Sequence, residues 1–459
     1  MKYDDVPRTR VQDLSRRELF FSQDFSAEEF RKRRATVARR IGKGSHALLC
    51  SAPPTSSDES MQDALFYYLC GLETTYTYLL ISGRDRKTTL FMPSREACGE
   101  ALEDALGHED AALIRKRLKI DAVKPVSEMT KHLQRVSTVY TPHAPVEGGG
   151  ATRWAARGCE NKRLEHEWDQ AEPQNVRFRR LLKEQFPDLT FEDLCPIIDE
   201  MRTIKSPAEI ALLRQAGQLS ATVMIESMKA TRPGATETQL QAIAEYIFRH
   251  HGHCGKGYGV IAASGTNTWQ GHYGRNNETL HSGELVLMDC GPDLRHYTSD
   301  IARVWPVSGT YDPWQRRVYG FITEYHKVLL SLIKPGCTAR EIYDEAAEIM
   351  KRMVKSRTFP YRNVTRLLLQ MIKKDVGYLN HGVGLSVHDA IGPWRDRPLR
   401  PGFVVVVDPM VWCKPQHHYI RVEDTIVVTR DGCERLTGDA PFEPDEIEAL
   451  MKEESSFRV

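Results

Sequence analysis

The chain has 459 residues, of which 41% are hydrophobic, and 63 Lys and Arg stand against 62 Asp and Glu. This length predicts two or three domains with sizeable cores, and the near balance of charge excludes a net electrostatic attraction to nucleic acid or to an anionic membrane. Met1–Arg10 is charged and lacks a signal-like apolar segment, and no run of about eighteen apolar residues occurs, so we expect a cytoplasmic protein without a membrane span.

The first part of the chain predicts a small mixed α/β domain. Ser26 and Glu29 form a capping-box pair that begins a helix through Arg40. The basic run 31–34 in this helix is interpreted as a solvated face, with nucleic-acid binding as the alternative. A mixed sheet flanked by helices would accommodate the β-rich runs 46–51, 76–82 and 88–92.

The spacing of the cysteines and histidines does not match a usual zinc-binding site. The 10 cysteines lie far apart without a Cys-x-x-Cys pair, which indicates reduced thiols, and Cys290 and Cys413 are interpreted as core residues. The His250, His251, His253 and Cys254 group lies where a helix runs out at Gly252, so exposed residues at a helix end are favoured over a metal site.

In the later part of the chain, one pattern of helix signals occurs twice. A helix pair with proline at the first helical position and a Pro-Gly stop occurs twice, about a hundred residues apart. The first helices begin at Ser206-Pro207, with Glu209 as box partner, and at Asp312-Pro313, and the second helices begin at Thr236 and Thr338. A two-fold repeat around a central cleft is the economical explanation, and chance recurrence is the alternative.

Four acidic residues and one histidine stand in or beside predicted strands of this repeat: Asp289, Asp300, His381, Asp408 and Glu423. The runs 285–289 and 298–305 should pair as a hairpin, which brings Asp289 and Asp300 together. Like charges so close repel unless cations neutralise them. Taken singly, each acid has an alternative as a surface or ion-pair residue. Together with one imidazole they suit two divalent ions, and a two-metal hydrolase is the leading interpretation.

Two neighbours of these acids complete the predicted site. Asp408 ends the apolar run 403–407, where burial would otherwise forbid a charge. Along 419–423, Arg421 and Glu423 share a face because side chains alternate in a strand. Arg421 is therefore expected to orient a ligand carboxylate from behind the metal site.

Several segments carry a resemblance to a known family: Met201–Ile210, the Asp289/Asp300 pair, His381–Asp389, Pro401-Gly402 and Arg421–Asp424. Together they resemble the aminopeptidase P and prolidase branch of the creatinase-like, pita-bread metallopeptidases. The likeness covers nearly the whole chain, and Phe66–Leu69 before Gly71 looks like the aminopeptidase P amino-terminal domain.

The resemblance implies an α/β (α+β) fold with two principal domains. A small mixed α/β N-terminal domain is expected at 1–150 and a helical connection at 151–188. A pita-bread domain with a pseudo-two-fold repeat and a curved antiparallel sheet is expected at 189–445, followed by a C-terminal tail at 446–459.

The resemblance also implies roles for the site residues. Asp289 would chelate one ion, Asp300 and Glu423 would bridge both, and His381 and Asp408 would complete the other. Two divalent ions are expected, with Mn²⁺ favoured and Co²⁺, Fe²⁺ and Zn²⁺ left open.

Two further histidines match family residues near the substrate carbonyl. His272 and His388 would stabilise charge on its oxygen, and each has an alternative as a satisfied core histidine. Asp408 occupies the position of the family's proton carrier. The implied substrate is a peptide with a free N-terminus and proline second, cut after its first residue by a hydroxide held between the cations.

The chain departs from the family pattern at several positions. The family has glutamate where Asp408 stands, so this side chain reaches about 1.5 Å less, and a misplacement near 1 Å costs about a hundredfold in rate. Met410 replaces a family glycine, Gly377 a histidine and Gly274 a threonine.

These departures keep two alternatives open. One is a prolidase-like Xaa-Pro dipeptidase, and the other is a catalytically weakened relative that binds a peptide or a partner protein. Neither nucleic acid nor membrane is expected as a partner, and relatives of this kind lead us to expect a homodimer or homotetramer.

Overall fold

The computed structural model describes residues 20–53, 62–98, 106–148, 150–251, 255–356, 362–373, 379–389 and 394–457. The chain divides into two compact units, the first comprising 1–54, 65–141 and 179–192 and the second comprising 55–64, 142–178 and 193–459. The segment 54–61, which includes the predicted Ser56–Ser60 loop, and the positions of Gly252, His253, Cys254 and Gly377 lie outside the described residues.

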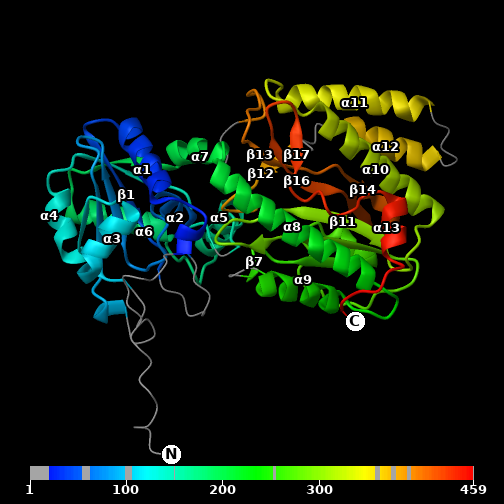
Figure 1. Cartoon of the computed structure of the whole chain (residues 1–459), viewed down its shortest axis with the longest axis horizontal. Coiled ribbons are helices and arrows are strands. Elements are labelled where there is room, and N and C mark those ends of the chain that lie inside the picture. Colours follow the sequence, from blue (N-terminus) through cyan, green and yellow to red (C-terminus); the bar gives the residue numbers. More distant parts are fainter. Residues whose placement is uncertain are drawn as a thin grey trace, which may run out of the picture. The chain divides into compact units, whose positions relative to one another are not determined.

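The first unit is built on a mixed six-stranded sheet of order β4-β3-β2-β1-β5-β6, seen in blue and cyan in Figure 1. Its strands are β1 (Ser45–Cys50), β2 (Tyr78–Ser82), β3 (Thr88–Met92), β4 (Ala122–Pro125), β5 (Thr138–Thr141) and β6 (Thr190–Asp193). The pairs β1–β2 and β2–β3 are antiparallel, whereas β1–β5 and β3–β4 are parallel. The helices are α1 (Ala27–Ile41), α2 (Ala64–Cys70), α3 (Ala111–Leu118) and α4 (Met129–Leu133).

The basic run in α1 is only partly the solvated face that the sequence predicted. Arg33 and Arg34 are buried, although the Ser26 side chain caps the helix as expected. The Arg34 guanidinium donates to the carbonyls of Leu69 and Leu118 at 2.9 and 2.8 Å. The prediction was wrong for these two residues because their guanidinium groups satisfy carbonyls at helix ends inside the unit.

The second unit contains a seven-stranded antiparallel sheet of order β12-β13-β16-β11-β9-β8, with β17 paired to β16. Its strands are β8 (Ile261–Ser264), β9 (Leu285–Cys290), β11 (Ile301–Pro306), β12 (Leu379–Gly382), β13 (Val404–Val407), β16 (Glu423–Val428) and β17 (Cys433–Arg435). Two short antiparallel pairs join β7 (Gly255–Lys256) to β10 (Pro292–Asp293) and β14 (Met410–Cys413) to β15 (His418–Arg421). The predicted curved antiparallel sheet and mixed α/β fold are confirmed.

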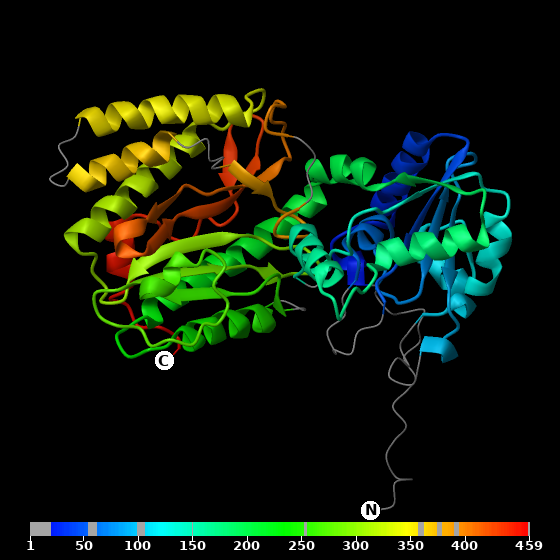
Figure 2. The ribbon, with the colours of Figure 1, turned by 180° about the vertical axis from the view of Figure 1, so that it is seen from behind.

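Two sets of helices flank this sheet (Figures 1 and 2). α8 (Pro207–Ala230) contacts β11, and α9 (Glu237–His251) contacts β8. On the other side, α10 (Pro313–Leu332) contacts β13, α12 (Arg362–Lys373) contacts β14, and α11 (Ala339–Ser356) packs on α10 and α12. The predicted caps form, since Ser206 with Glu209 and Asp312 with Gln315 make reciprocal capping boxes. The remaining helices are α5 (Arg153–Glu165), α6 (Gln174–Gln185), α7 (Cys195–Thr203) and α13 (Pro444–Leu450).

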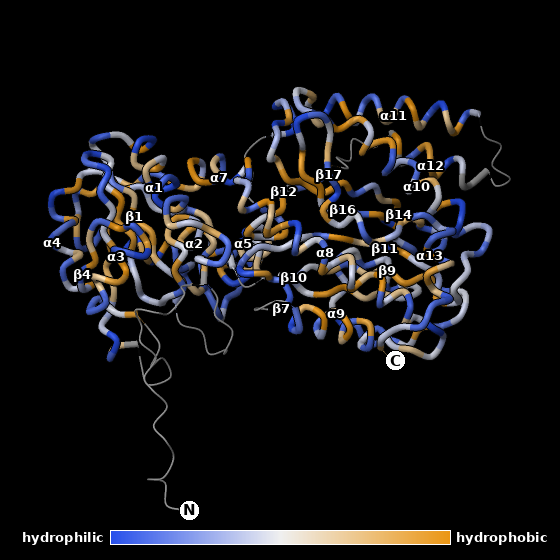
Figure 3. Tube along the Cα trace, viewed as in Figure 1, coloured by the Kyte–Doolittle hydropathy of each residue, from blue (hydrophilic) through white to orange (hydrophobic). Residues whose placement is uncertain are grey.

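The core of the second unit lies where the strands meet the helices, as the hydrophobic colouring along β9, β11 and β16 shows in Figure 3. Every residue of β9, β11 and β16 is buried. The largest buried side chain is Trp305, whose indole nitrogen donates to Thr231 at 2.9 Å. Polar side chains inside this layer therefore need a partner or a function.

The run 419–423 is not the single strand that the sequence predicted. β15 ends at Arg421 and pairs with β14, whereas β16 begins at Glu423 and joins the main sheet. Between them the Val422 amide donates to the Pro409 carbonyl at 3.2 Å. The chain bends there, so its two halves pair with different strands.

Candidate metal centre and active-site cleft

The five predicted ligands lie at strand ends around one point of the main sheet. Asp289 is on β9, Asp300 immediately precedes β11, His381 is on β12, Asp408 immediately follows β13, and Glu423 begins β16. The register pairs Asp289 with Ala302 and Ala302 with Glu423, which places these two acids at the same level on either side of β11. Asp300 stands two residues before Ala302, on the same face of the sheet. The four carboxylates are buried and His381 is half-buried.

Three of these side chains form a tight donor set. One atom each of Asp300, His381 and Glu423 lies within 4.8 Å of the others. His381 Nε2 is 3.5 Å from Asp300 Oδ2 and 3.9 Å from Glu423 Oε1. Glu423 Oε1 is buried and has no hydrogen-bond partner among the described residues. A buried, unpartnered carboxylate oxygen beside an imidazole nitrogen fits a divalent cation.

The imidazole of His381 is oriented for such a role by the backbone. Its Nδ1 lies 3.2 Å from the Gly382 carbonyl oxygen. When Nδ1 carries the proton and donates it to this oxygen, Nε2 is left as an acceptor facing the carboxylates. A second hydrogen bond that fixes the ring and its tautomer is typical of metal-binding histidines.

Arg421 makes direct contacts with the other carboxylates. Its Nη1 donates to Asp289 Oδ2 at 3.0 Å, and its Nε and Nη2 donate to the two oxygens of Asp408 at 3.0 and 3.2 Å. Nη2 also donates to Glu423 Oε2. Arg421 therefore holds three acids, and both oxygens of Asp408 face the guanidinium rather than the donor set of Asp300 and His381.

Burial sets the protonation of the site. It raises the pKa of Asp289 to about 7, with a further contribution from the Asp300 charge, and it raises the pKa values of Asp300 and Asp408 to about 6 despite Arg421. Burial, followed by the neighbouring His388, holds the pKa of His381 well below its usual value. A bound cation would stabilise the ionised form of these carboxyls, so protons and metal compete for the same oxygens.

Tyr258 belongs to the site and was missed in the sequence. Its hydroxyl oxygen lies 2.8 Å from Asp289 Oδ1 and 2.7 Å from Asp300 Oδ1, so its one proton is shared between the two acids and the hydroxyl bridges them. Burial and the charge of Asp289 raise the pKa of this phenol well above its usual value, so it stays a donor. Only the Gly-rich run around it gave a signal, because Gly257 marks a close approach to the backbone of Pro292.

The two predicted carbonyl-side histidines both line the cleft in front of the carboxylates. His272 is exposed and His388 is half-buried, so neither is a core histidine. The rings of His388 and His381 lie 4.2 Å apart. Burial, followed by His272, lowers the pKa of His388, which keeps the ring neutral and able to donate one hydrogen bond.

A buried acid fixes the loop that carries His272. Glu237, in the first turn of α9, accepts hydrogen bonds from the Ser264 amide, the Asn267 side chain and the Tyr273 hydroxyl at 2.6, 3.0 and 3.0 Å. The Glu278 amide donates to the same carboxylate at 3.0 Å. Donors on both sides of His272 thus converge on one residue, which sets the position of the loop.

A second buried network holds Asp389, the neighbour of His388. Asp389 pairs with Lys205 at 2.7 Å and with Arg202. Arg202 in turn pairs with Glu147 at 2.7 Å. Because breaking a buried ion pair is strongly destabilising, this network ties the His388 loop to α7 and to the segment before α5.

The cleft in front of the carboxylates has a volume of about 960 Å³. Its walls include Met410, Trp412 and Tyr419, and Trp412 stacks on Tyr419 with ring centroids 4.2 Å apart. A cleft of this size with apolar walls and a few converging polar groups is typical of a ligand site.

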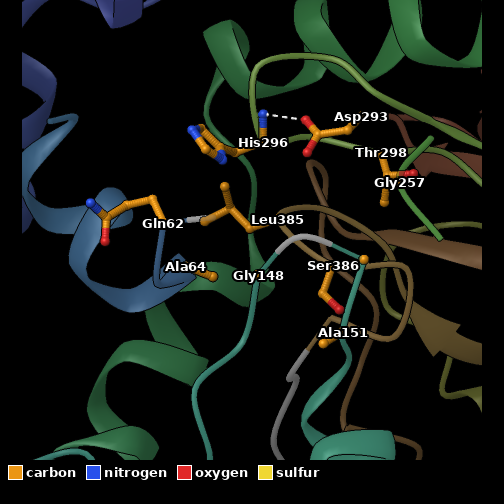
Figure 4. Close-up of a pocket in the computed structure, with 11 residues that line it drawn as sticks. Gln62, Ala64, Gly148, Ala151, Gly257, Asp293, His296, Thr298, Leu385 and Ser386 are labelled. Atoms are coloured by element: carbon orange, nitrogen blue, oxygen red, sulfur yellow. Dashed lines mark hydrogen bonds between the residues drawn. The ribbon is translucent and has the colours of Figure 1, made fainter. Parts of the chain in front are cut away.

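The second cavity is much smaller and has a different lining (Figure 4). Leu385 and Ser386 point into it from the loop between His381 and His388, and Gln62 approaches from another segment. Its volume of about 20 Å³ holds roughly one water molecule. The His296 amide donates to Asp293 at its edge. None of the five predicted ligands lines this cavity, so it is not the predicted site.

Comparison with known proteins identifies the family. Residues 211–430 match metallopeptidase family M24, and residues 30–142 match the aminopeptidase P N-terminal domain. The Xaa-Pro aminopeptidase of Escherichia coli (strain K12) is 30% identical over 452 residues, which cover 93% of this chain and 98% of the relative. The chain belongs to metallopeptidase family M24. The predictions of this family and of a metal-dependent exopeptidase are confirmed.

Other relatives and solved structures are also similar to this chain over most of its length. The mitochondrial intermediate cleaving peptidase 55 of Arabidopsis thaliana is 28% identical, covering 92% of this chain and 83% of the relative. Escherichia coli aminopeptidase P with the inhibitor Pro-Leu superposes with a TM-score of 0.76 at 29% identity, covering 93% of this chain and 98% of that one. The zinc-substituted form with product gives a TM-score of 0.75 at 30% identity over the same shares of the two chains.

Proposed function

We propose that the chain removes the N-terminal residue from peptides with proline in the second position. One observation carries the proposal: the Asp300, His381 and Glu423 donor set opens into the cleft that His272 and His388 line. Two bacterial Xaa-Pro aminopeptidases, from Escherichia coli and Haemophilus influenzae, match 93% and 95% of the chain.

Two divalent cations are proposed as cofactors, with Mn²⁺ favoured. Asp300, His381 and Glu423 would hold one ion, and Asp289 with Asp300 and Glu423 would hold the other. When bound, divalent cations lower the pKa of water and polarise a carbonyl group. Four buried carboxylates against one guanidinium support the cation requirement, because Arg421 alone does not balance their charge.

The side chains of the chain then have separate tasks. His272 and His388 would donate hydrogen bonds to the carbonyl oxygen as its negative charge grows. Asp408, with its pKa raised to about 6 by burial, is placed to hold and move a proton. Arg421 keeps this carboxyl in position, and Tyr258 sets the spacing of Asp289 and Asp300.

The test is hydrolysis of tripeptides by the purified protein with Mn²⁺. We expect release of the first residue from Xaa-Pro-Yaa and no release from the matched Xaa-Ala-Yaa. His381→Ala, which removes the one imidazole of the donor set, is the inactive control. Elemental analysis of the same samples measures metal identity and content. Intact Xaa-Pro-Yaa in the presence of bound Mn²⁺ would refute the proposed reaction.

The remaining assignments from the sequence stay proposals. Comparing a dipeptide with longer substrates separates the aminopeptidase from the dipeptidase. A cytoplasmic location is supported by the free thiols of the described cysteines. Among the described residues, no helix is both long and apolar enough to cross a bilayer. The domain limits at 150, 188 and 445, the homo-oligomer, and the absence of nucleic-acid and membrane partners are proposed on the same footing.

A further inference from the structure

An exposed tryptophan stands at the rim of the cleft. Trp154, at the start of α5, is 72% exposed and lines the cleft that holds the carboxylates. Its ring centroid is 6.3 Å from that of His272. Tryptophan is enriched among the residues that contribute most to binding, and this one lines a ligand cleft.

We propose that Trp154 binds the part of a peptide substrate that follows the proline, so that this chain favours peptides of three or more residues over Xaa-Pro dipeptides. The inference rests on the proposed function and specifies its substrate class. Xaa-Pro dipeptides end at the proline and present nothing to this side chain.

The depth of the cleft fixes the direction of the bound peptide. Asp289, Asp300 and Asp408 at its inner end are 5%, 3% and 1% exposed, whereas Trp154 and Lys256 at its rim are exposed. An exopeptidase that releases the first residue must place the free N-terminus at the inner end. The residues after the scissile bond then run outward past His272 and reach Trp154.

The base of Trp154 is rigid even though its ring is in water. Thr152 caps α5 by accepting a hydrogen bond from the Ala155 amide at 3.1 Å. The adjacent Arg153 pairs with Asp199 at 2.8 Å and with Glu147 at 3.3 Å. Glu147 also belongs to the network that holds the His388 loop, so the indole keeps its place relative to the histidines. A pre-positioned aromatic ring loses little entropy on binding.

The same helix supplies a matched control. Trp168, in the turn after α5, is 84% exposed and does not line the cleft. Replacing either tryptophan removes a similar exposed ring without opening a core. Trp154→Ala and Trp168→Ala therefore differ mainly in their distance from the substrate path, and Trp154→Phe should restore much of an aromatic contact.

The experiment compares substrate length in the holoenzyme loaded with Mn²⁺. We expect kcat/KM of the parent to rise from Xaa-Pro to Xaa-Pro-Yaa and Xaa-Pro-Yaa-Zaa. Trp154→Ala should lose about five- to tenfold on the longer peptides, mainly through KM, as expected for a single aromatic contact. Its dipeptide turnover should be unchanged, and Trp168→Ala should match the parent throughout.

Calorimetry supplies a readout independent of turnover. The probe is Pro-Leu, whose leucine follows the proline, and the parent and Trp168→Ala should bind it more tightly than Trp154→Ala does. Equal length dependence in the parent and Trp154→Ala would overturn the inference while leaving the proposed peptidase intact. If the parent neither cleaves nor binds these peptides, the proposed function and the inference both fail. The inference would also be overturned if both tryptophan variants changed their oligomeric state without changing their dependence on peptide length. That result would assign α5 to a contact between protein chains.

Discussion

Lengthening Asp408 by one methylene tests how the catalytic carboxyl is positioned. In this chain both oxygens of Asp408 face Arg421, at 3.0 and 3.2 Å, and the side chain is 1% exposed. Asp408→Glu moves the carboxylate about 1.5 Å further from the backbone. That shift carries it past the guanidinium toward the donor set of His381 and Glu423.

The expected gain follows from the size of that shift. A misplacement near 1 Å costs about a hundredfold in rate, which corresponds to about 2.7 kcal/mol in the barrier. Overpacking opposes the gain, since an extra methylene in a well-packed site costs about 1–3 kcal/mol of stability. We therefore expect Asp408→Glu to raise metal content and kcat by up to about a hundredfold while lowering the melting temperature.

The assay measures kcat, KM, metal per chain and thermal unfolding for the parent, Asp408→Glu and Asp408→Asn. The Asn variant keeps the length and removes the charge, so it should lose activity and leave Arg421 with one fewer carboxylate. Equal activity and equal metal content in the parent and Asp408→Glu would refute the reasoning, because the shorter side chain would then already serve the site fully.

Three further outcomes test the site and its support. Tyr258→Phe removes the hydroxyl that bridges Asp289 and Asp300, so calorimetry should show metal affinity lower by about ten- to a hundredfold. Because burial raises the pKa values of Asp289 and Asp300 to about 7 and 6, protons compete with the cation, and metal affinity should fall as the pH drops from about 8 to 5.5. Asp424→Asn breaks a buried pair with Arg303 and should cost about 3–5 kcal/mol of unfolding free energy at neutral pH. Burial acts to raise the pKa of Asp424, but Arg303, Arg435 and His326 together outweigh it and lower the pKa. The contribution is therefore lost progressively as the pH falls below about 4, and acid unfolding should separate the two proteins less than neutral unfolding does.

Local signals in the sequence predicted the helices of the second unit well. Ser206-Pro207 and Asp312-Pro313 begin α8 and α10 as expected, because capping boxes are decided within four consecutive residues. Contacts between residues far apart in the sequence cannot be predicted from four consecutive residues. Arg33 and Arg34 read as surface residues, yet they satisfy carbonyls from α2 and α3 that lie far along the chain.

The carboxylates of the candidate site were found because each is a charge beside an apolar strand. Tyr258 was missed because a tyrosine in a glycine-rich run is not an unexpected charge beside an apolar strand. Its function depends on the positions of two acids that are distant in the sequence. The contacts of Arg421 were also underestimated. Alternation along one strand predicted its nearness to Glu423 correctly, but the bend at Val422 directs the guanidinium at Asp289 and Asp408 as well.

The bend at Val422 gives Arg421 a part in deciding how strongly the site binds its cations. One guanidinium shared among Asp289, Asp408 and Glu423 leaves the Asp300 side of the site without a cationic partner among its described contacts. A divalent ion beside Asp300 and His381 therefore gains most, whereas an ion beside Asp289 must compete with Arg421 for the same oxygens. The shortened Asp408 strengthens that competition, because its carboxylate stays with the guanidinium. The aspartate substitution and the position of Arg421 thus act together on the metal centre, which is why a single methylene at residue 408 is the most informative change in this chain.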